Sequence, residues 1–161
     1  MRDIFEKNFS ENHFIGLGIT SRKTINNDYS YYNSFSIFDS KVNLIDNYNK
    51  IKLVPFGEFV PIENILNKFG LKTITNNIGS FNKGVNRKII KIQDDLKQIN
   101  FLPLICYEII YSGNLTKDFD FDFILNISED GWFGKSIGPK QHFIHSKFRA
   151  IENGKYIIRS S

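Results

Sequence analysis

The stretch from Phe101 to Ile110 (FLPLICYEII) constrains the fold most strongly. It is an apolar run that ends in the only cysteine of the chain, Cys106, with a carboxylate, Glu108, two residues later. A β-rich run followed by helix-compatible residues predicts a strand that turns sharply into a helix, which is where α/β enzymes present a nucleophile. The alternative is a buried structural cysteine in a strand, because free cysteine is among the most buried residue types.

Composition limits the class of protein. A chain of 161 residues with 41% apolar and 15% aromatic residues predicts one globular domain. The formal charge of +4 is spread along the chain, which argues against a nucleic-acid partner and leaves attraction to an anionic membrane surface open. A single cysteine excludes an internal disulfide, and three scattered histidines provide no zinc site, so we expect no metal and no cofactor.

Membrane and targeting segments are not expected. No window contains 18 uninterrupted apolar residues, and the first seven residues carry acids and lack an apolar core. The sequence therefore predicts neither a transmembrane helix nor a signal peptide.

Hydrophobic patterning predicts a layered α/β or α+β domain over residues 1–161, with no internal boundary. A buried strand at His13–Ile19 is expected to run into a polar loop at 20–29. A hairpin of Ser34–Phe38 with Val42–Ile45 should follow. The later elements are expected to be a helix at 61–70, an exposed excursion at 73–86, strands at 88–92, 99–106, 121–127 and 155–159, and helices at 108–117 and 138–154.

Lys50 is the candidate partner of the cysteine. A cysteine nucleophile reacts as a thiolate, so it needs a nearby cation or base, and an acyl intermediate needs donors that face the developing oxyanion. Lys50 precedes a stiff, partly apolar run at Leu53–Pro61 that would hold it in place. The alternative is that Lys50 and Lys52 are solvated loop lysines.

Two glutamates have similar alternatives. Glu58 and Glu108 are either surface acids or acceptors for backbone donors in a turn, and Glu108 in the first turn of a helix would be favoured by the helix dipole. Glu58 is the less ordinary of the two, because a carboxylate between Phe56 and Phe59 needs a polar partner.

An ordered set of motifs resembles the apolipoprotein N-acyltransferases of the carbon–nitrogen hydrolase (nitrilase) superfamily. Together the motifs cover nearly the whole chain from Tyr48 onward. They are Tyr48-Asn-Lys50, Leu53-Val-Pro-Phe-Gly-Glu-Phe-Val-Pro61, Cys106-Tyr-Glu108, Asn126-Ile-Ser, Asp130-Gly-Trp-Phe-Gly134, Gly138-Pro, Gln141-His142 and Arg149-Ala-Ile-Glu152.

The resemblance implies an α-β-β-α sandwich, here incomplete at both ends. It assigns Cys106 as the nucleophile and Lys50 as the catalytic lysine, with Glu58, Tyr107 and Glu108 as supporting residues of the site. It also places the loop with Trp132 and Phe133 at the border of the substrate pocket. For these two aromatic residues the alternative is a place in the core.

The activity implied by the resemblance is a two-step acyl transfer. The cysteine takes an acyl chain from a phospholipid as a thioester and passes it to the α-amino group of the diacylglyceryl-cysteine at the N-terminus of an apolipoprotein. The family carries out this reaction on the periplasmic face of the bacterial inner membrane, without a cofactor. We expect this chain to lack an anchor of its own and to be a partial catalytic domain.

The sequence departs from the family pattern in the catalytic base. The family's base glutamate lies in a Pro-Glu motif upstream of the lysine, and nothing before Tyr48 matches it. Glu6 and Glu11 lie in a polar opening segment and are not candidates. A smaller departure is Glu129, where the family has a neutral amide. His142 is interpreted as a structural histidine rather than a base.

Three hypotheses remain. We favour the acyltransferase, because the Leu53–Pro61 block has the form typical of that family. The second hypothesis is a soluble amidase or nitrilase that hydrolyses a small carbon–nitrogen substrate. The third is a partial domain without catalysis, whose open sheet edge pairs with other chains and causes aggregation.

Overall fold

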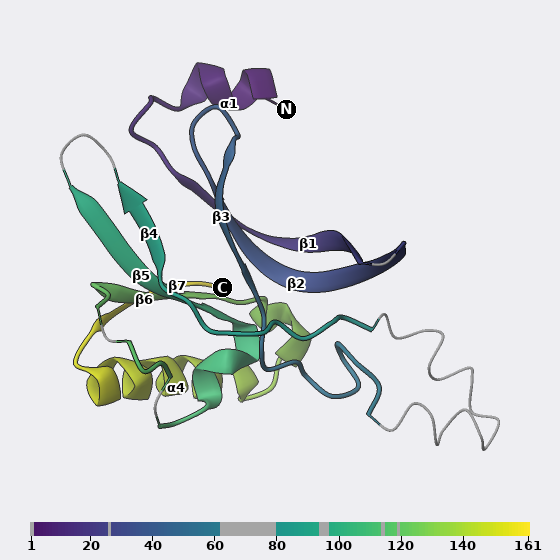
Figure 1. Cartoon of the computed structure of the whole chain (residues 1–161). Helices are drawn as coiled ribbons and strands as arrows, with labels where there is room; N and C mark the ends of the chain where they lie inside the picture. The colour runs from purple at the N-terminus through teal and green to yellow at the C-terminus, as the bar shows by residue number, and fades with distance from the viewer. Residues whose placement is uncertain (1, 26, 62–79, 94–96, 114, 119) are drawn as a thin grey trace.

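Two β-sheets packed face to face form the body of the protein, and a helix covers the outer face of the second sheet (Figure 1). The computed structural model describes residues 2–25, 27–61, 80–93, 97–113, 115–118 and 120–161. A short helix, α1 (Arg2–Asn8), precedes the first sheet. Its three antiparallel strands lie in the order β1 (Ile15–Ile25), β2 (Asp28–Phe38) and β3 (Leu44–Asn49).

The β1–β2 hairpin is longer than the sequence indicates. Pairing extends from Ile15 opposite Phe38 to Ile25 opposite Asp28, so the predicted loop at 20–29 is wrong. Long cross-strand pairing overrides the polar composition of this stretch, because strand preference depends on the neighbouring strand more than on the residue itself. The predicted burial of the first strand is also wrong, since β1 is an edge strand and Leu17 is 42% exposed.

The hairpin between β2 and β3 confirms the prediction for residues 34–45. Its turn is held by Asp39, whose carboxylate accepts hydrogen bonds from the backbone N–H groups of Lys41 and Asn43. The hydrogen bonds from Asn43, through its backbone N–H and its side-chain amide, do most to hold the pKa of Asp39 below its usual value. The turn brings β3, which leads to Lys50, back along the buried half of β2.

The second sheet has the order β4 (Ile90–Gln93), β5 (Gln98–Ile105), β6 (Phe123–Ile127) and β7 (Tyr156–Ser160). Strand β4 is antiparallel to β5, whereas β5, β6 and β7 are parallel. Side chains of β5 alternate between two cores. Phe101 and Ile105 meet the first sheet, and Leu102 and Leu104 pack on the helical side. Burial on both faces explains why this stretch is an uninterrupted apolar run.

The helical layer consists of α4 (Gly138–Asn153) and the 3₁₀ helix η1 (Cys106–Ile110). The helix predicted at 138–154 is confirmed, with Gly154 ending it in the left-handed conformation. The helix predicted at 108–117 is wrong beyond Ile110, because Tyr111 is extended and Gly113 has a φ of 84°. Within the part of the chain described, no helix is both long and apolar enough to cross a membrane.

The apolar stripe of α4 faces solvent. Ile144, Phe148 and Ile151 are about half exposed or more, whereas His142, Ser146 and Arg149 form the buried face. The usual amphipathic arrangement is thus inverted at these positions, where His142 and Arg149 contact the carbonyl oxygens of Cys106 and Ile110 in η1. The helix predicted at 61–70 and the first part of the excursion at 73–86 lie outside the described residues.

Candidate active site

Cys106 lies at a strained elbow between β5 and η1. Its φ of 48° falls in the left-handed region, which costs a residue other than glycine on the order of 1–3 kcal/mol and occurs mainly at functional sites. The residue is partly exposed rather than fully buried. The predicted strand-to-helix elbow is therefore confirmed, and the buried structural cysteine does not fit this position.

Glu108 connects this elbow to the loop that follows β3. Its carboxylate is fully buried and accepts hydrogen bonds from the backbone N–H groups of Ile105 (2.9 Å), Ile51 (3.0 Å) and Lys52 (3.1 Å) and from the Tyr48 hydroxyl (2.9 Å). A surface location for Glu108 is therefore wrong. Glu108, two residues after Cys106, therefore connects Ile105, the residue before Cys106, to the two residues that follow Lys50.

The phenol of Tyr48 supports this buried carboxylate. Burial, with the charge of Glu108 beside it, raises the pKa of Tyr48 well above its usual value. The phenol therefore remains protonated and donates to Glu108. Arg87 balances the charge, because its Nη1 lies 3.7 Å from the Glu108 carboxylate and 3.3 Å from the Tyr48 hydroxyl.

Lys50 is buried, with 1% of its side chain exposed, so the solvated-lysine alternative is wrong for this residue. Its Nζ donates to Glu58 Oε2 at 2.7 Å. Glu58 also accepts from the Val54 backbone N–H at 2.8 Å and from the Asn33 side-chain amide. The polar partner expected for Glu58 is thus an ion pair with Lys50, whereas Lys52 is exposed.

Gly84 holds the other side of the Lys50 backbone. Its N–H donates to the Lys50 carbonyl at 2.8 Å, and a Cβ at this position would lie 2.1 Å from the Asn49 carbonyl oxygen. Only glycine permits such a close approach. The sequence did not predict this contact. The one feature that could have indicated it is a glycine in a polar stretch where no turn requires one.

A polar network lies behind the elbow. His142 is 2% exposed, its Nε2 lies 3.1 Å from the Cys106 carbonyl oxygen, and its Nδ1 lies 2.9 Å from Asp130 Oδ1. Burial raises the pKa of Asp130, but hydrogen bonds from His142, Ser128 and Arg159 outweigh this effect and hold the pKa below its usual value. Asp130 is therefore ionised. Sequence reasoning treated His142 as structural and did not foresee its contact with the cysteine backbone.

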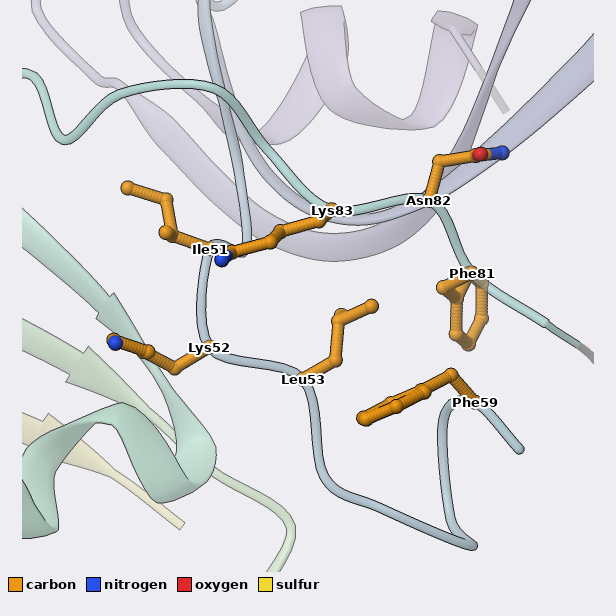
Figure 2. Close-up of a pocket in the computed structure, with 7 residues that line it drawn as sticks. All are labelled: Ile51, Lys52, Leu53, Phe59, Phe81, Asn82 and Lys83. Atoms are coloured by element: carbon orange, nitrogen blue, oxygen red, sulfur yellow. The ribbon is translucent and has the colours of Figure 1, made fainter. Parts of the chain in front are cut away.

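A cavity of about 350 Å³ opens beside the Lys50 loop. Figure 2 shows the rings of Phe59 and Phe81 on one side of it and Lys52 and Leu53 on the other. The lining residues are Ile51, Lys52, Leu53, Phe59, Phe81, Asn82 and Lys83. The wall of this cavity is partly apolar, and its polar side chains are those of Lys52, Lys83 and Asn82.

The loop with Trp132 and Phe133 lies outside the lining of this cavity. Trp132 is 86% exposed, so a core location is wrong for it. Phe133 packs edge-on against the His142 ring at 5.5 Å between centroids. Neither residue lines the cavity beside Lys50. Glu129 accepts a hydrogen bond from the Gly131 N–H and so caps the 3₁₀ helix η2 (Asp130–Phe133).

Comparison with known proteins identifies the family. The sequence pattern of the family described as Carbon-nitrogen hydrolase matches residues 10–161. The chain belongs to the carbon–nitrogen hydrolase family. Among curated proteins, it is 41% identical over 132 residues to an apolipoprotein N-acyltransferase of Rhizobium rhizogenes and 36% identical over 132 residues to that of Brucella suis. Each alignment covers 81% of this chain and 24% of the relative, so the chain spans about a quarter of the length of these relatives.

Solved structures of carbon–nitrogen hydrolases agree with the fold. An amidase from Nesterenkonia sp. AN1, with acrylamide added to its active-site cysteine, superposes with a TM-score of 0.55 at 13% identity over 99% of this chain and 51% of the amidase. A glutamine-dependent NAD⁺ synthetase from Acinetobacter baumannii gives a TM-score of 0.60 at 17% identity over 98% of this chain and 25% of the synthetase. At such identities the likeness concerns the fold, which is the α-β-β-α sandwich expected from the sequence.

Proposed function

We propose that this chain carries the nucleophile and the oxyanion-stabilising lysine of an apolipoprotein N-acyltransferase. The observation that carries the proposal is the Glu108 clamp, which ties the backbone after Lys50 to the elbow that presents Cys106. Relatives at about 40% identity that bear this name support the choice among carbon–nitrogen hydrolases. In this proposal, the Cys106 thiol and the Lys50 amine belong to one site.

In the first step, the Cys106 thiolate attacks the acyl carbonyl carbon of a phospholipid. A carbon–sulfur bond forms while the carbonyl electron pair moves to oxygen, and Lys50 stabilises that oxyanion. Collapse of the intermediate breaks the ester carbon–oxygen bond. The lysophospholipid leaves as an alcohol with the proton that the thiol lost.

In the second step, the α-amino nitrogen of a diacylglyceryl-cysteine attacks the thioester. A carbon–nitrogen bond forms, the carbon–sulfur bond breaks, and the proton of the amine returns to the Cys106 sulfur. A thioester divides one difficult displacement into two easier ones. The partners of the chain are therefore a phospholipid acyl donor and an apolipoprotein acceptor at the periplasmic surface of a bacterial inner membrane.

Glu58 is the carboxylate proposed to assist proton movement. Glu108 already accepts hydrogen bonds from three backbone N–H groups and the Tyr48 hydroxyl, so it is committed to holding the loop. Glu58 also accepts hydrogen bonds from Val54 and Asn33, but it differs from Glu108 in contacting Lys50 directly, at 2.7 Å, and in being partly exposed rather than fully buried. General acid–base catalysis requires such a group at hydrogen-bonding distance.

The test is intact-mass spectrometry of the purified chain after incubation with phospholipid in detergent micelles. We expect a mass gain of one acyl chain that hydroxylamine removes and that Cys106→Ala abolishes. Release of ammonia from short aliphatic amides without an adduct would favour the amidase. Absence of both reactions would refute catalysis by this chain.

A further inference from the structure

The carbonyl group of Cys106 is held by two donors from different elements. His142 on α4 places Nε2 at 3.1 Å, and Asn126 on β6 places Nδ2 at 3.4 Å from the same oxygen. Both side chains are almost fully buried. A carbonyl oxygen only accepts hydrogen bonds, so the Nε2 of His142 must carry a hydrogen.

The orientation of Asn126 is determined by Arg159. A guanidinium group only donates, so the amide oxygen of Asn126 faces Arg159 Nη1 at 2.5 Å. The amide nitrogen is thereby directed toward the carbonyl oxygens of Leu104, at 3.0 Å, and Cys106. A flipped amide would leave Arg159 facing another donor.

His142 is oriented by the same charged pair. Its Nδ1 lies 2.9 Å from Asp130 Oδ1 and 3.1 Å from Arg159 Nη2, so this nitrogen has a partner in either protonation state. The other Asp130 oxygen accepts from Arg159 Nη2 at 2.6 Å. The ring also packs between Tyr107 and Phe133, with centroids at 6.2 and 5.5 Å. It has little freedom to turn away.

We propose that His142 is a positioning residue that holds the peptide group after Cys106 in its reactive orientation. Across a trans peptide, the carbonyl oxygen of one residue and the N–H of the next point in opposite directions. A donor that fixes the Cys106 oxygen therefore directs the Tyr107 N–H away from His142, to the front of the elbow. At nucleophile elbows, this N–H is a donor to the oxyanion.

The same bonds maintain the strained conformation of the nucleophile. Cys106 has a left-handed φ of 48°, which a free peptide would relax. Strain of this kind persists only where the surroundings hold it in place. Asp130, Arg159 and Asn126 thus act on the cysteine through its own backbone, and none of them touches the reacting atoms in this scheme. The inference rests on Cys106 being the nucleophile of the proposed function.

The experiment compares two amide substitutions of this chain, His142→Gln and His142→Asn. A glutamine amide reaches the Cys106 carbonyl, whereas the shorter asparagine amide reaches only the position of Nδ1. Both variants place a neutral amide at the same buried position, so they share a similar risk of misfolding. Ser146→Ala on the same buried face of α4 is the control, since its hydroxyl donates only within the helix, to Phe143.

Two rates are measured for each variant, namely alkylation of Cys106 by iodoacetamide and acyl-adduct formation from phospholipid micelles. We expect His142→Asn to lower both rates by about 10- to 100-fold, the range for leaving a buried hydrogen-bonding group without its partner. His142→Gln should remain within about threefold of the unsubstituted chain, as a conservative rescue, by the same scale. The control should match the unsubstituted chain.

Equal rates for His142→Asn and the unsubstituted chain would overturn the inference. Equal losses in the two amide variants would also overturn it, because they would indicate a structural role that any change at 142 disrupts. Failure of the unsubstituted chain to form an acyl adduct, with alkylation still dependent on residue 142, would refute the proposed function and leave the positioning role intact.

Discussion

Replacing Glu108 by glutamine should cost more stability than any other single carboxylate-to-amide change in the described part of the chain. The carboxylate is fully buried and both of its oxygens accept hydrogen bonds. Glutamine has only one acceptor oxygen, so either the Ile105 N–H or the pair from Ile51 and Lys52 would face an NH₂ group. In addition, Arg87, 3.7 Å away, would lose its counter-charge.

The magnitude follows from these contacts. One lost hydrogen bond to a charged acceptor costs about 1.5–3 kcal/mol, and leaving its buried donor unpaired adds about 1–3 kcal/mol. Breaking a buried ion pair by removing one partner costs a similar total of about 3–5 kcal/mol. For a domain of this size, such a loss lowers the Tm by roughly 6–20 °C.

The assay is urea unfolding of Glu108→Gln beside Glu11→Gln. Glu11 pairs with Lys41 at 3.5 Å and both side chains are exposed, so its substitution should cost less than about 1 kcal/mol. Alkylation of Cys106 should also slow in Glu108→Gln, because the elbow loses its tie to the Lys50 loop. A free energy of unfolding within about 0.5 kcal/mol of the unsubstituted chain would refute the clamp, since surface substitutions lie in that range.

Three further predictions concern the same region. Lys50→Met should slow acyl-adduct formation, measured by mass spectrometry, by about 100- to 1,000-fold, which is the usual effect of losing a donor to the oxyanion. An unchanged rate would exclude Lys50 as the oxyanion donor. Gly84→Ala should destabilise the chain by about 1–3 kcal/mol in urea unfolding, because its Cβ meets the Asn49 carbonyl, whereas an equal stability would contradict that contact. The pKa of Asp130 in the folded chain lies below its usual 3.8, so its contribution to stability should be fully present above pH 3.8 and disappear as the pH falls through the lower folded value. In unfolding measurements, Asp130→Asn should therefore lose less stability than the unsubstituted chain as the pH is lowered.

The fold could be predicted where the residues of a strand or helix by themselves determine its conformation. The run at 101–105 is apolar because both faces of β5 are buried, and this pattern predicted the strand and its elbow. The helix predicted at 138–154 is confirmed because Pro139 in its first turn and Gly154 at its end have backbone preferences that act locally. The 20–29 loop and the 108–117 helix were wrong, since long pairing with β2 and a turn after Ile110 decided those segments.

For the site, the sequence determined which chemical groups exist and in what order. It marked Cys106 at an elbow, Lys50 before a stiff loop, and Glu58 in need of a partner, because a single cysteine and a carboxylate among aromatic residues are visible in the sequence itself. Each of these features depends on neighbours a few residues away.

Only the tertiary structure decided which groups meet. Glu108 binds backbone N–H groups 56 and 57 positions earlier, and His142 reaches the Cys106 carbonyl across 36 positions. The inverted burial of α4 has the same origin, since His142 and Arg149 on its buried face contact the carbonyl oxygens of Cys106 and Ile110. Hydrogen bonds over such separations depend on how the two sheets and the helix pack together, which the local pattern of apolar and polar residues does not specify.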